Sequence, residues 1–544
     1  MSLSSLLFAG KGGSLTSFFS LAYFAGFLPI CLIVYSLMPK AWKKYFLLLV
    51  SYSFFWLISG KLLAYLILST FSIHYFGLWL DRIQNQMHAV LAATDKENRK
   101  AVKKAFISRQ RAVVLLAVFL HIGILLVIKY TGFFTTNINS LLSFVHIPVQ
   151  LEIAKYLMPI GISFFTLQAL SYILDVYHGV TKADDNLFRL ALFLGFFPQI
   201  VEGPICRYHQ TADKLWNVKQ IRYENLSLGI QRILFGMMKK IVIADRLNPL
   251  VKHVFMNDAE YEGGIIAIAA VCYTVQLYMD FSGSMDAVIG TAQIFGIKMP
   301  ENFKRPFFSK TISEFWQRWH ITLGTWFKDY IFYPITAAKS MKHLTSSARK
   351  KVGNHYGPLL AGSIALFCVW LCNGLWHGSA WNYIFFGMYH FALILCGNII
   401  SPVVAWTNNK LHVNPEWFGY RLMQILRTTI LVIIGELFFR ANGLRAGLHM
   451  FKTMVTNFSF STLNDELLVK LGIDRLDFII VGITLLIVLA VSILNEKEID
   501  IRNVLAQKNV MLRWATLYAL ILYIVVFGSY GFGYTPVDPL YAQF

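Results

Sequence analysis

Charged residues are scarce in this sequence. Only 14% of its 544 residues are Asp, Glu, Lys or Arg, whereas a soluble domain usually carries about 25%. The hydrophobic fraction is 56% and the mean hydropathy is +0.54. Polar residues form short segments rather than domain-sized blocks. This composition excludes a water-soluble fold and indicates one all-α, polytopic membrane domain spanning residues 1–544.

Features of several other protein classes are missing. The six cysteines show neither paired C-x-x-C spacing nor a disulfide framework, so we expect packing or lipid-facing cysteines and no metal site. There is no internal repeat or low-complexity tract. Residues 1–16 lack the pattern of a cleavable signal peptide. We therefore expect the first apolar segment to be retained as a span.

Acidic residues are outnumbered by basic ones, which gives a formal net charge of +20. Such an excess could indicate a nucleic-acid partner. In membrane proteins, however, Lys and Arg also accumulate in cytoplasmic loops and fix the orientation of the helices. Because most of the basic residues lie in alternate loops, the bilayer is the expected partner and nucleic acid is not.

A window of about 20 residues predicts twelve membrane spans. They lie near residues 17–38, 45–59, 61–80, 112–131, 151–177, 226–245, 263–281, 357–376, 381–405, 421–440, 478–494 and 513–530. Placing the basic loops in the cytoplasm puts both termini outside, with residues 531–544 as an extracytoplasmic tail.

Two apolar stretches do not fit simple crossings. Residues 187–205 are interrupted by Pro198, Glu202 and Pro204, which favours a re-entrant segment, because broken backbone at membrane depth is tolerated where protein covers it. Residues 307–335 mix Trp and Phe with charges at helical spacing. This pattern predicts one amphipathic helix in the cytoplasmic interface.

His377 is the leading candidate for chemistry. It lies in LCNGLWHGSAWNYIFFGMYH, residues 371–390, where one predicted span ends and the next begins. An ionisable side chain near the bilayer marks a functional site by default, and an imidazole can take a proton from a hydroxyl nucleophile. The alternative is a packing histidine that hydrogen-bonds a buried carbonyl. For His390, thirteen residues later, the structural interpretation is favoured.

His320 is a second candidate, within EFWQRWH at residues 314–320. Arg318 and Lys328, on either side of it, could meet the phosphates of an incoming carrier or nucleotide. The aromatic residues around them would equally suit a membrane-interface belt, and the two interpretations have equal weight.

Other polar side chains fall inside apolar segments. Charged pairing between helices would explain most of them without catalysis, although Gln276 and Asp280 are kept as candidate substrate contacts. The set comprises Gln199, Glu202, Arg207, Gln276, Asp280, Glu436 and Arg440.

Several motifs together resemble the membrane-bound O-acyltransferase (MBOAT) family, in its bacterial branch of alginate O-acetyltransferase and teichoic-acid D-alanyl transfer. They are MPIGISFFTLQALSYILDVYHG at 158–179, FFPQIVEGPICRY at 196–208, YMDFSGSMDAVIG at 278–290, ENFKRPFFSKTISEFWQRWHITLGTWFKDYIFYPI at 301–335, NGLWHGSAWNYIFFGMYH at 373–390 and FFRANGLRAGLHMF at 438–451.

The resemblance implies that His377 is the catalytic residue and His320 a second functional histidine on the cytoplasmic side. It also implies a ring of tilted helices with funnels from both faces. No bound cofactor is expected. The donor would be acyl-CoA or an acyl-carrier thioester, docked near His320, and Asn373 or backbone N–H groups would meet the oxyanion. Trp376 would line the same site.

The expected reaction moves an acyl group, foremost acetyl, toward hydroxyls of an extracellular or cell-wall polysaccharide. D-alanyl transfer to teichoic acid is an alternative, and an extracytoplasmic partner transferase of the SGNH-hydrolase type fits the acetyl case. A transporter or a non-catalytic scaffold of a surface-polymer complex are interpretations from other classes. The absence of inverted repeats disfavours the transporter.

The C-terminal tail, GYTPVDPLYAQF, ends in apolar residues. Tyr541 to Phe544 resemble the end of a small companion protein of the teichoic-acid system. A tyrosyl ester would remain activated, because a phenol of pKa about 10 leaves more easily than an alkyl alcohol. Tyr541 is therefore a candidate acyl carrier, while an aromatic anchor at the interface is the alternative.

Overall fold

The structure is a computed structural model that describes residues 18–20, 22–153 and 156–530. Over these ranges the chain forms helices and connecting loops, and contains no strand. The predicted all-α class is confirmed. The described chain divides into two compact units, one formed mainly by residues up to Ile230 together with Val288–Pro300, and the other by most of the remainder.

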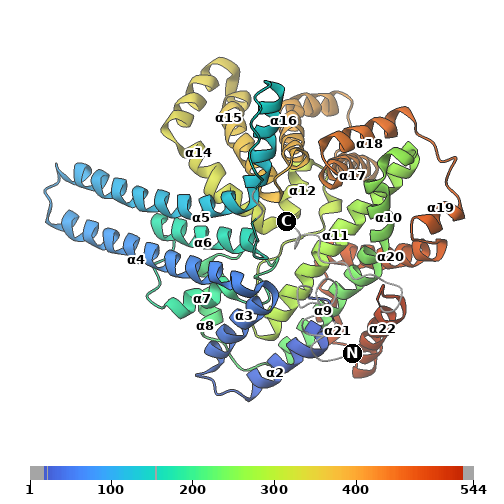
Figure 1. The fold of residues 1–544 in the computed structure, drawn as a ribbon, viewed down its shortest axis with the longest axis horizontal. Coiled ribbons are helices and arrows are strands. Elements are labelled where there is room, and N and C mark those ends of the chain that lie inside the picture. The colour runs from blue at the N-terminus through green and yellow to red at the C-terminus, as the bar shows by residue number, and fades with distance from the viewer. Residues whose placement is uncertain (1–17, 21, 154–155, 531–544) are drawn as a thin grey trace. The chain divides into compact units, whose positions relative to one another are not determined.

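In the first unit the dominant feature is a long hairpin of α4 and α5, which pack against each other and against α6 (Figure 1). The helices of this unit are η1 Ala22–Phe27, α2 Leu28–Leu37, α3 Lys43–Ser59, η2 Gly60–Leu62, α4 Leu63–Ala93, α5 Arg99–Phe144, α6 Ile162–His178, α7 Leu187–Gly195 and α8 Tyr208–Trp216. Helix α9 (Tyr223–Met237) follows them and passes the boundary between the units.

The second unit carries the candidate site. Its helices are η3 Met238–Ala244, α10 Asp245–Met256, η4 Asp258–Glu260, α11 Gly263–Ile294 for all but its last residues, η5 Pro306–Phe308, α12 Ile312–Arg318, α13 Ile321–Phe327, η6 Lys328–Phe332, α14 Tyr333–Ala337, α15 Lys339–His377, α16 Trp381–Lys410, α17 Phe418–Arg440, α18 Leu444–Thr456, α19 Asp465–Lys470, α20 Arg475–Glu496, α21 Ile501–Ala506 and α22 Val510–Phe527.

Helix covers most of each predicted span, but the first part of the span predicted at 151–177 is not helical, since residues 151–153 and 156–161 form loop and turn before α6 begins at Ile162. Eight helical segments of the described chain are long and apolar enough to cross a membrane, and one of them, Lys43–Ala93, contains two predicted spans. The other three predicted spans form the shorter helices η1–α2 and α6, and α9 continued by the π-helix η3. Large apolar side chains such as Phe119, Ile483 and Leu522 are exposed on the long helices, as a lipid-facing surface requires.

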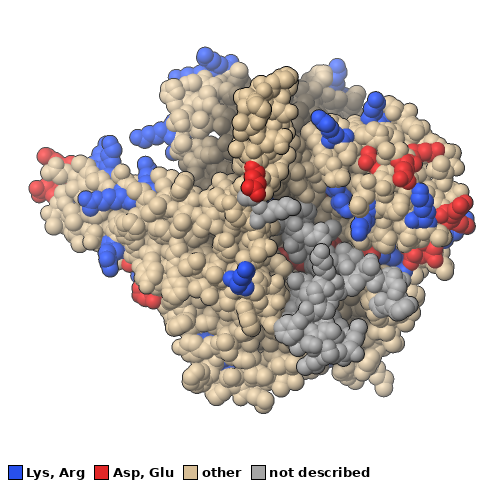
Figure 2. Space-filling view, viewed as in Figure 1, with Lys and Arg blue, Asp and Glu red and all other residues tan. Residues whose placement is uncertain are grey.

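The visible face in Figure 2 carries few acidic or basic side chains over most of its area. The same scarcity in the sequence indicated a membrane protein. The sparse charge on this face and the eight apolar helices together support a multi-pass membrane protein.

The interrupted segment 187–205 forms a short helix, α7, followed by turns that are almost completely buried. A Cβ at Gly161 would meet the carbonyl oxygen of Ile200 at 2.0 Å, so the turn lies directly against the start of α6. Broken backbone covered by protein is what the sequence pattern predicted.

The prediction of one amphipathic helix over residues 307–335 is wrong. The chain there forms the short helices η5, α12, α13, η6 and α14. The main break follows Arg318, the last residue of α12: Trp319 is extended, and His320, with a left-handed backbone (φ 45°, ψ 50°), directs the chain into α13. Charges at helical spacing predicted the helical conformation but not this reversal.

Helices α15 and α16 form a tightly packed hairpin around the turn at Gly378. A Cβ at Gly374 would lie 2.5 Å from the carbonyl oxygen of Tyr383, and one at Gly387 would lie 2.4 Å from that of Trp370. Small residues at helix crossings let two backbones approach closely in membranes. The glycines thus hold the helix that ends in His377 against its neighbour.

We predict that Gly387→Ala destabilises the protein by about 1–3 kcal/mol, because the added methyl group has no room. The thermal unfolding midpoint in detergent measures this. Gly397→Ala, on the same helix but with open space around its Cβ, is the matched control and should be neutral or slightly stabilising. Equal midpoints for the two variants would contradict the packing argument.

Candidate active site

The two candidate histidines lie on either side of one tryptophan. The ring centroid of Trp376 is 4.9 Å from that of His377 and 5.6 Å from that of His320. Both histidines are 2% exposed. Residues 57 positions apart in the sequence are therefore brought into a single buried cluster, in which the Trp376 ring joins the two imidazoles.

His377 is the last residue of α15 and lies among aromatic rings. Phe439 of α17 is 5.1 Å away and Phe386 of α16 is 6.1 Å away, between ring centroids. A Cβ at the next residue, Gly378, would clash with the Tyr383 ring. Gly378 therefore lets the first turn of α16 pack directly against the end of α15.

Asn382 connects the start of α16 to the end of α17. Its Nδ2 lies 3.2–3.4 Å from the backbone carbonyl oxygens of Phe438, Phe439 and Ala441. These carbonyls are at the C-terminal end of a helix, where no intrahelical donor is available. Asn382 thereby fixes Phe439 against the His377 ring.

His320 is held by a loop that returns to it from residue 302. The backbone N–H of Ile321 donates to the carbonyl of Asn302 at 3.0 Å, and the Lys304 N–H donates to the carbonyl of Arg318 at 2.9 Å. These bonds fix the left-handed backbone at His320. The ring packs edge-on against Phe281 of α11, with 4.9 Å between ring centroids.

Burial lowers the pKa of His320 to about 3, since the charged imidazolium loses its hydration. His320 lies outside the eight candidate spans. It is therefore a neutral imidazole over the physiological pH range, able to accept a proton or a hydrogen bond rather than act as a fixed positive charge.

His390 occupies a structural position, as the sequence favoured. The Trp316 Nε1–H donates to His390 Nδ1 at 3.2 Å, and Trp370 stacks on the same imidazole with 5.4 Å between centroids. A Cβ at Gly435 would lie 2.7 Å from His390 Nε2. This cluster ties α12, which leads into His320, to the hairpin that carries His377.

The remaining predicted contacts are placed as follows. Asn373, one turn before His377, is buried, and its Oδ1 accepts no hydrogen bond from the described residues. Arg318 pairs with Glu314 at 2.9 Å and with Glu496 at 3.0 Å. Lys328 is exposed, with its Nζ 5.5 Å from the centroid of the Tyr333 ring.

Asp280 and Gln276 of α11 are already engaged with neighbouring helices. Asp280 pairs with Lys240 at 2.8 Å, and the Gln276 Nε2 donates to Asn248 Oδ1 at 3.0 Å. Helix pairing was the favoured explanation for both residues. The sequence reasoning missed Lys239 and Lys240, although two lysines inside a predicted span are a recognisable signal of buried ion pairs.

The other polar candidates lie outside the cluster of His320, Trp376 and His377. Gln199, Glu202 and Arg207 are buried in the first unit. Glu436 is buried in the second unit, where the Thr274 hydroxyl lies beside it, and the Arg440 guanidinium lies 5.7 Å from the centroid of the Phe255 ring. Tyr541 lies outside the described residues.

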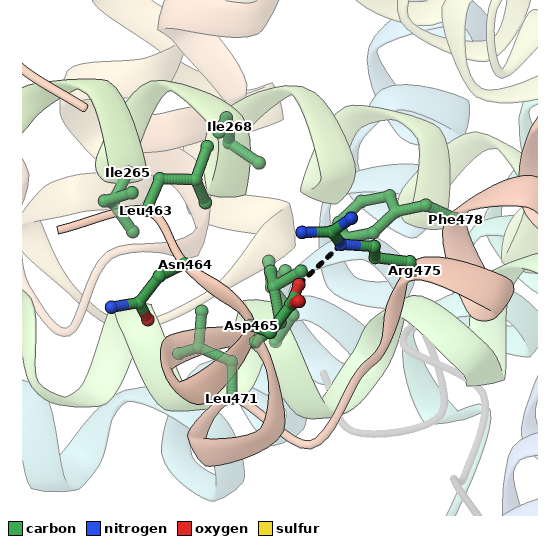
Figure 3. A pocket seen from close by; sticks show the side chains of 10 residues that line it. Ile265, Ile268, Leu463, Asn464, Asp465, Leu471, Arg475 and Phe478 are labelled. Carbon is green, nitrogen blue, oxygen red and sulfur yellow. Dashed lines mark hydrogen bonds and ion pairs between the residues drawn. The ribbon is translucent and has the colours of Figure 1, made fainter. Parts of the chain in front are cut away.

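A separate cavity of about 510 Å³ contains none of the predicted site residues. It is lined mainly by apolar side chains of α10, α11, α19 and α20, including Ile265, Leu471 and Phe478 (Figure 3). The ion pair of Arg475 with Asp465 spans 2.5 Å at this cavity.

Comparison with known proteins decides the family. Residues 180–348 match the membrane-bound O-acyltransferase family. The chain is 30% identical over 452 residues to the probable alginate O-acetylase AlgI of Pseudomonas syringae pv. tomato, covering 83% of this chain and 77% of that protein. The AlgI of Azotobacter vinelandii is 30% identical over 455 residues, 83% of this chain and 80% of that protein. The chain belongs to the membrane-bound O-acyltransferase family.

Other relatives in this family have different acceptors in their names. The teichoic acid D-alanyltransferase of Bacillus subtilis is 34% identical over 254 residues, 44% of this chain and 59% of that protein. The family assignment makes this chain a multi-pass membrane O-acyltransferase, and it removes the transporter and scaffold interpretations.

We predict that Trp316→Phe lowers stability by about 1–3 kcal/mol, because buried His390 Nδ1 loses its hydrogen-bond donor. The thermal midpoint in detergent measures the effect. Trp370→Phe is the matched control, since Trp370 touches the same imidazole by stacking and loses comparable volume. If both variants melt at the same temperature, the hydrogen bond contributes nothing beyond ring packing.

Proposed function

We propose that this O-acyltransferase carries an acyl group, foremost acetyl, from a cytoplasmic thioester toward hydroxyls of a surface polysaccharide in a bacterial cytoplasmic membrane. The observation that carries the proposal is the cluster of His320, Trp376 and His377. It supplies two imidazoles at one buried site in a chain that belongs to an O-acyltransferase family.

The donor side is assigned to His320 and the surrounding segment 301–335. Basic residues of this segment suit the phosphates of a coenzyme A or of a carrier-bound pantetheine. The lowered pKa of His320 keeps its ring neutral. The ring can therefore accept a hydrogen bond from an N–H or O–H group near the thioester. Arg318 would exchange its partner Glu496 for a phosphate when the donor binds.

In the transfer step, His377 takes the proton from a hydroxyl whose oxygen attacks the thioester carbonyl. The carbon–sulfur bond then breaks, and the leaving thiolate takes the proton back from His377, which regenerates the neutral base. Asn373 or nearby backbone N–H groups would stabilise the oxyanion, which a water-poor site makes worth several kcal/mol. The hydrophobic rings of Trp376, Phe386 and Phe439 exclude water around His377.

We assign the acceptor side to the extracytoplasmic face, where the charge distribution of the loops predicts that both termini lie. Tyr541 would receive the acyl group at His377 as a phenyl ester and pass it to an extracytoplasmic partner transferase of the SGNH-hydrolase type. The names of relatives support this class of acceptor, since they include an alginate O-acetylase and a peptidoglycan O-acetyltransferase of Helicobacter pylori.

We predict that His377→Ala abolishes transfer while expression and membrane insertion stay near normal, because the change removes the base while the backbone contacts at Gly374 and Gly387 still hold α15 against α16. Release of label from acetyl thioester and D-alanyl thioester donors, in proteoliposomes with the partner proteins, measures both the loss and the acyl preference. His343→Ala, at an exposed histidine, is the matched control. More than a tenth of wild-type turnover in His377→Ala would exclude the central-base role.

We predict that Tyr541→Phe stops acylation of the polymer, because the change keeps the aromatic ring and removes only the nucleophilic hydroxyl. Polymer-bound label in the same proteoliposomes is the measurement. Tyr530→Phe, at the last described residue, is the control. If the Tyr541→Phe variant acylates the polymer at the wild-type level, the tail acts only as an aromatic anchor at the interface.

A further inference from the structure

Asn302 is a completely buried side chain that contacts the second histidine. Its Oδ1 lies 3.3 Å from His320 Nδ1, 3.0 Å from the backbone nitrogen of Thr322 and 2.9 Å from the Thr322 hydroxyl. Its Nδ2 lies 3.3 Å from the sulfur of Met285 on α11. Every polar atom of this amide is therefore used within the site.

The orientation of the amide follows from the backbone. The N–H of Thr322 can only donate, so the atom facing it must be the oxygen of Asn302. The same oxygen faces His320 Nδ1, which must then carry a hydrogen. In a neutral imidazole one nitrogen is a donor and the other an acceptor. The lone pair of His320 therefore lies on Nε2.

The groups around His320 do not favour an imidazolium. The rings of Phe281 and Trp376 pack against it, and the Asn302 amide that faces its Nδ1 is uncharged. Burial lowers the pKa of His320. The ring is thus a neutral base whose Nδ1 faces the Asn302 oxygen.

We propose that Asn302 is a positioning residue that holds His320 as the Nδ1–H tautomer and so presents Nε2 as the proton or hydrogen-bond acceptor during use of the thioester donor. The inference rests on the proposed donor-side role of His320. Removing a residue that orients a functional histidine typically lowers activity on the order of tenfold or more.

A purely structural role must be separated from this one, because Asn302 also holds the loop through its own carbonyl and through Thr322. Thr322→Val is the matched control, since it removes one hydrogen bond to the same Oδ1 and leaves the contact with His320. Asn302→Leu removes the acceptor, and Asn302→Asp keeps an acceptor at the same place.

The experiment compares steady-state donor turnover of these variants with that of His320→Ala, alone and combined with Asn302→Leu. We expect Asn302→Leu to lower kcat about tenfold or more, with the donor KM changed by less than about threefold. Thr322→Val should stay close to wild type. The combined variant should be no slower than His320→Ala, because a residue that acts through His320 has nothing to orient once that ring is gone.

Asn302→Asp tests the inference even if Asn302→Leu does not fold. We expect activity near that of the wild type at alkaline pH and a new loss at acidic pH. The added carboxylate raises the pKa of His320, and the imidazolium that forms as the pH falls has no lone pair. Activity as low as that of a His320→Ala variant at every pH would overturn the inference.

Two further outcomes would also overturn it. One is a Thr322→Val variant as slow as Asn302→Leu, and the other is multiplication of the Asn302→Leu and His320→Ala effects. A fully active His320→Ala variant would instead remove the donor-side role itself, together with the inference that rests on it. The failure of the inference alone can therefore be distinguished from failure of the proposed function.

Discussion

The need to give buried polar groups a partner organises the second unit of this protein. A polar or charged group buried away from water costs several kcal/mol unless it is hydrogen-bonded or paired. Lys240, 1% exposed, is accordingly paired with Asp245 and Asp280, each at 2.8 Å. Lys239 pairs with Asp286 at 2.5 Å. The π-helix that carries both lysines is thereby joined to α11.

The same constraint shapes the candidate active site. Helix α11 holds the lysines through Asp280 and Asp286 and supports His320 through Phe281 and Met285, the latter by way of Asn302. Buried ion pairs and the candidate chemistry therefore share one helix. Because a buried pair that loses one partner leaves an uncompensated charge, this helix has little freedom to shift, which suits a site that must hold its imidazoles in fixed positions.

The aromatic residues supply what the polar contacts do not. Trp376, Phe386 and Phe439 surround His377, while Trp316 and Trp370 enclose His390. The first group keeps water away from the His377 imidazole. The second fixes α12 on the α15–α16 hairpin. Phe386 belongs to both groups, since its ring centroid lies 6.1 Å from that of His377 and 4.7 Å from that of His390.

The sequence by itself determined the class of the protein. Scarce charge and repeated apolar runs indicate a helical membrane protein, since only segments that satisfy their own backbone can cross a bilayer. The predicted spans are helical over most of their lengths, and the motifs around His320 and His377 indicated the family that the comparisons established. These properties depend on local composition and on short motifs, which a sequence displays directly.

Only the tertiary structure decided which of these segments contact one another. No spacing rule indicated that Trp376 would touch both histidines, that Asn302 would set the tautomer of His320, or that Asp280 would face Lys240. The left-handed residue His320 also broke a helix that charge periodicity had predicted. Each of these features results from contacts between segments distant in the sequence, and the energy of such contacts depends on which backbones approach closely enough to share a hydrogen bond or exclude water.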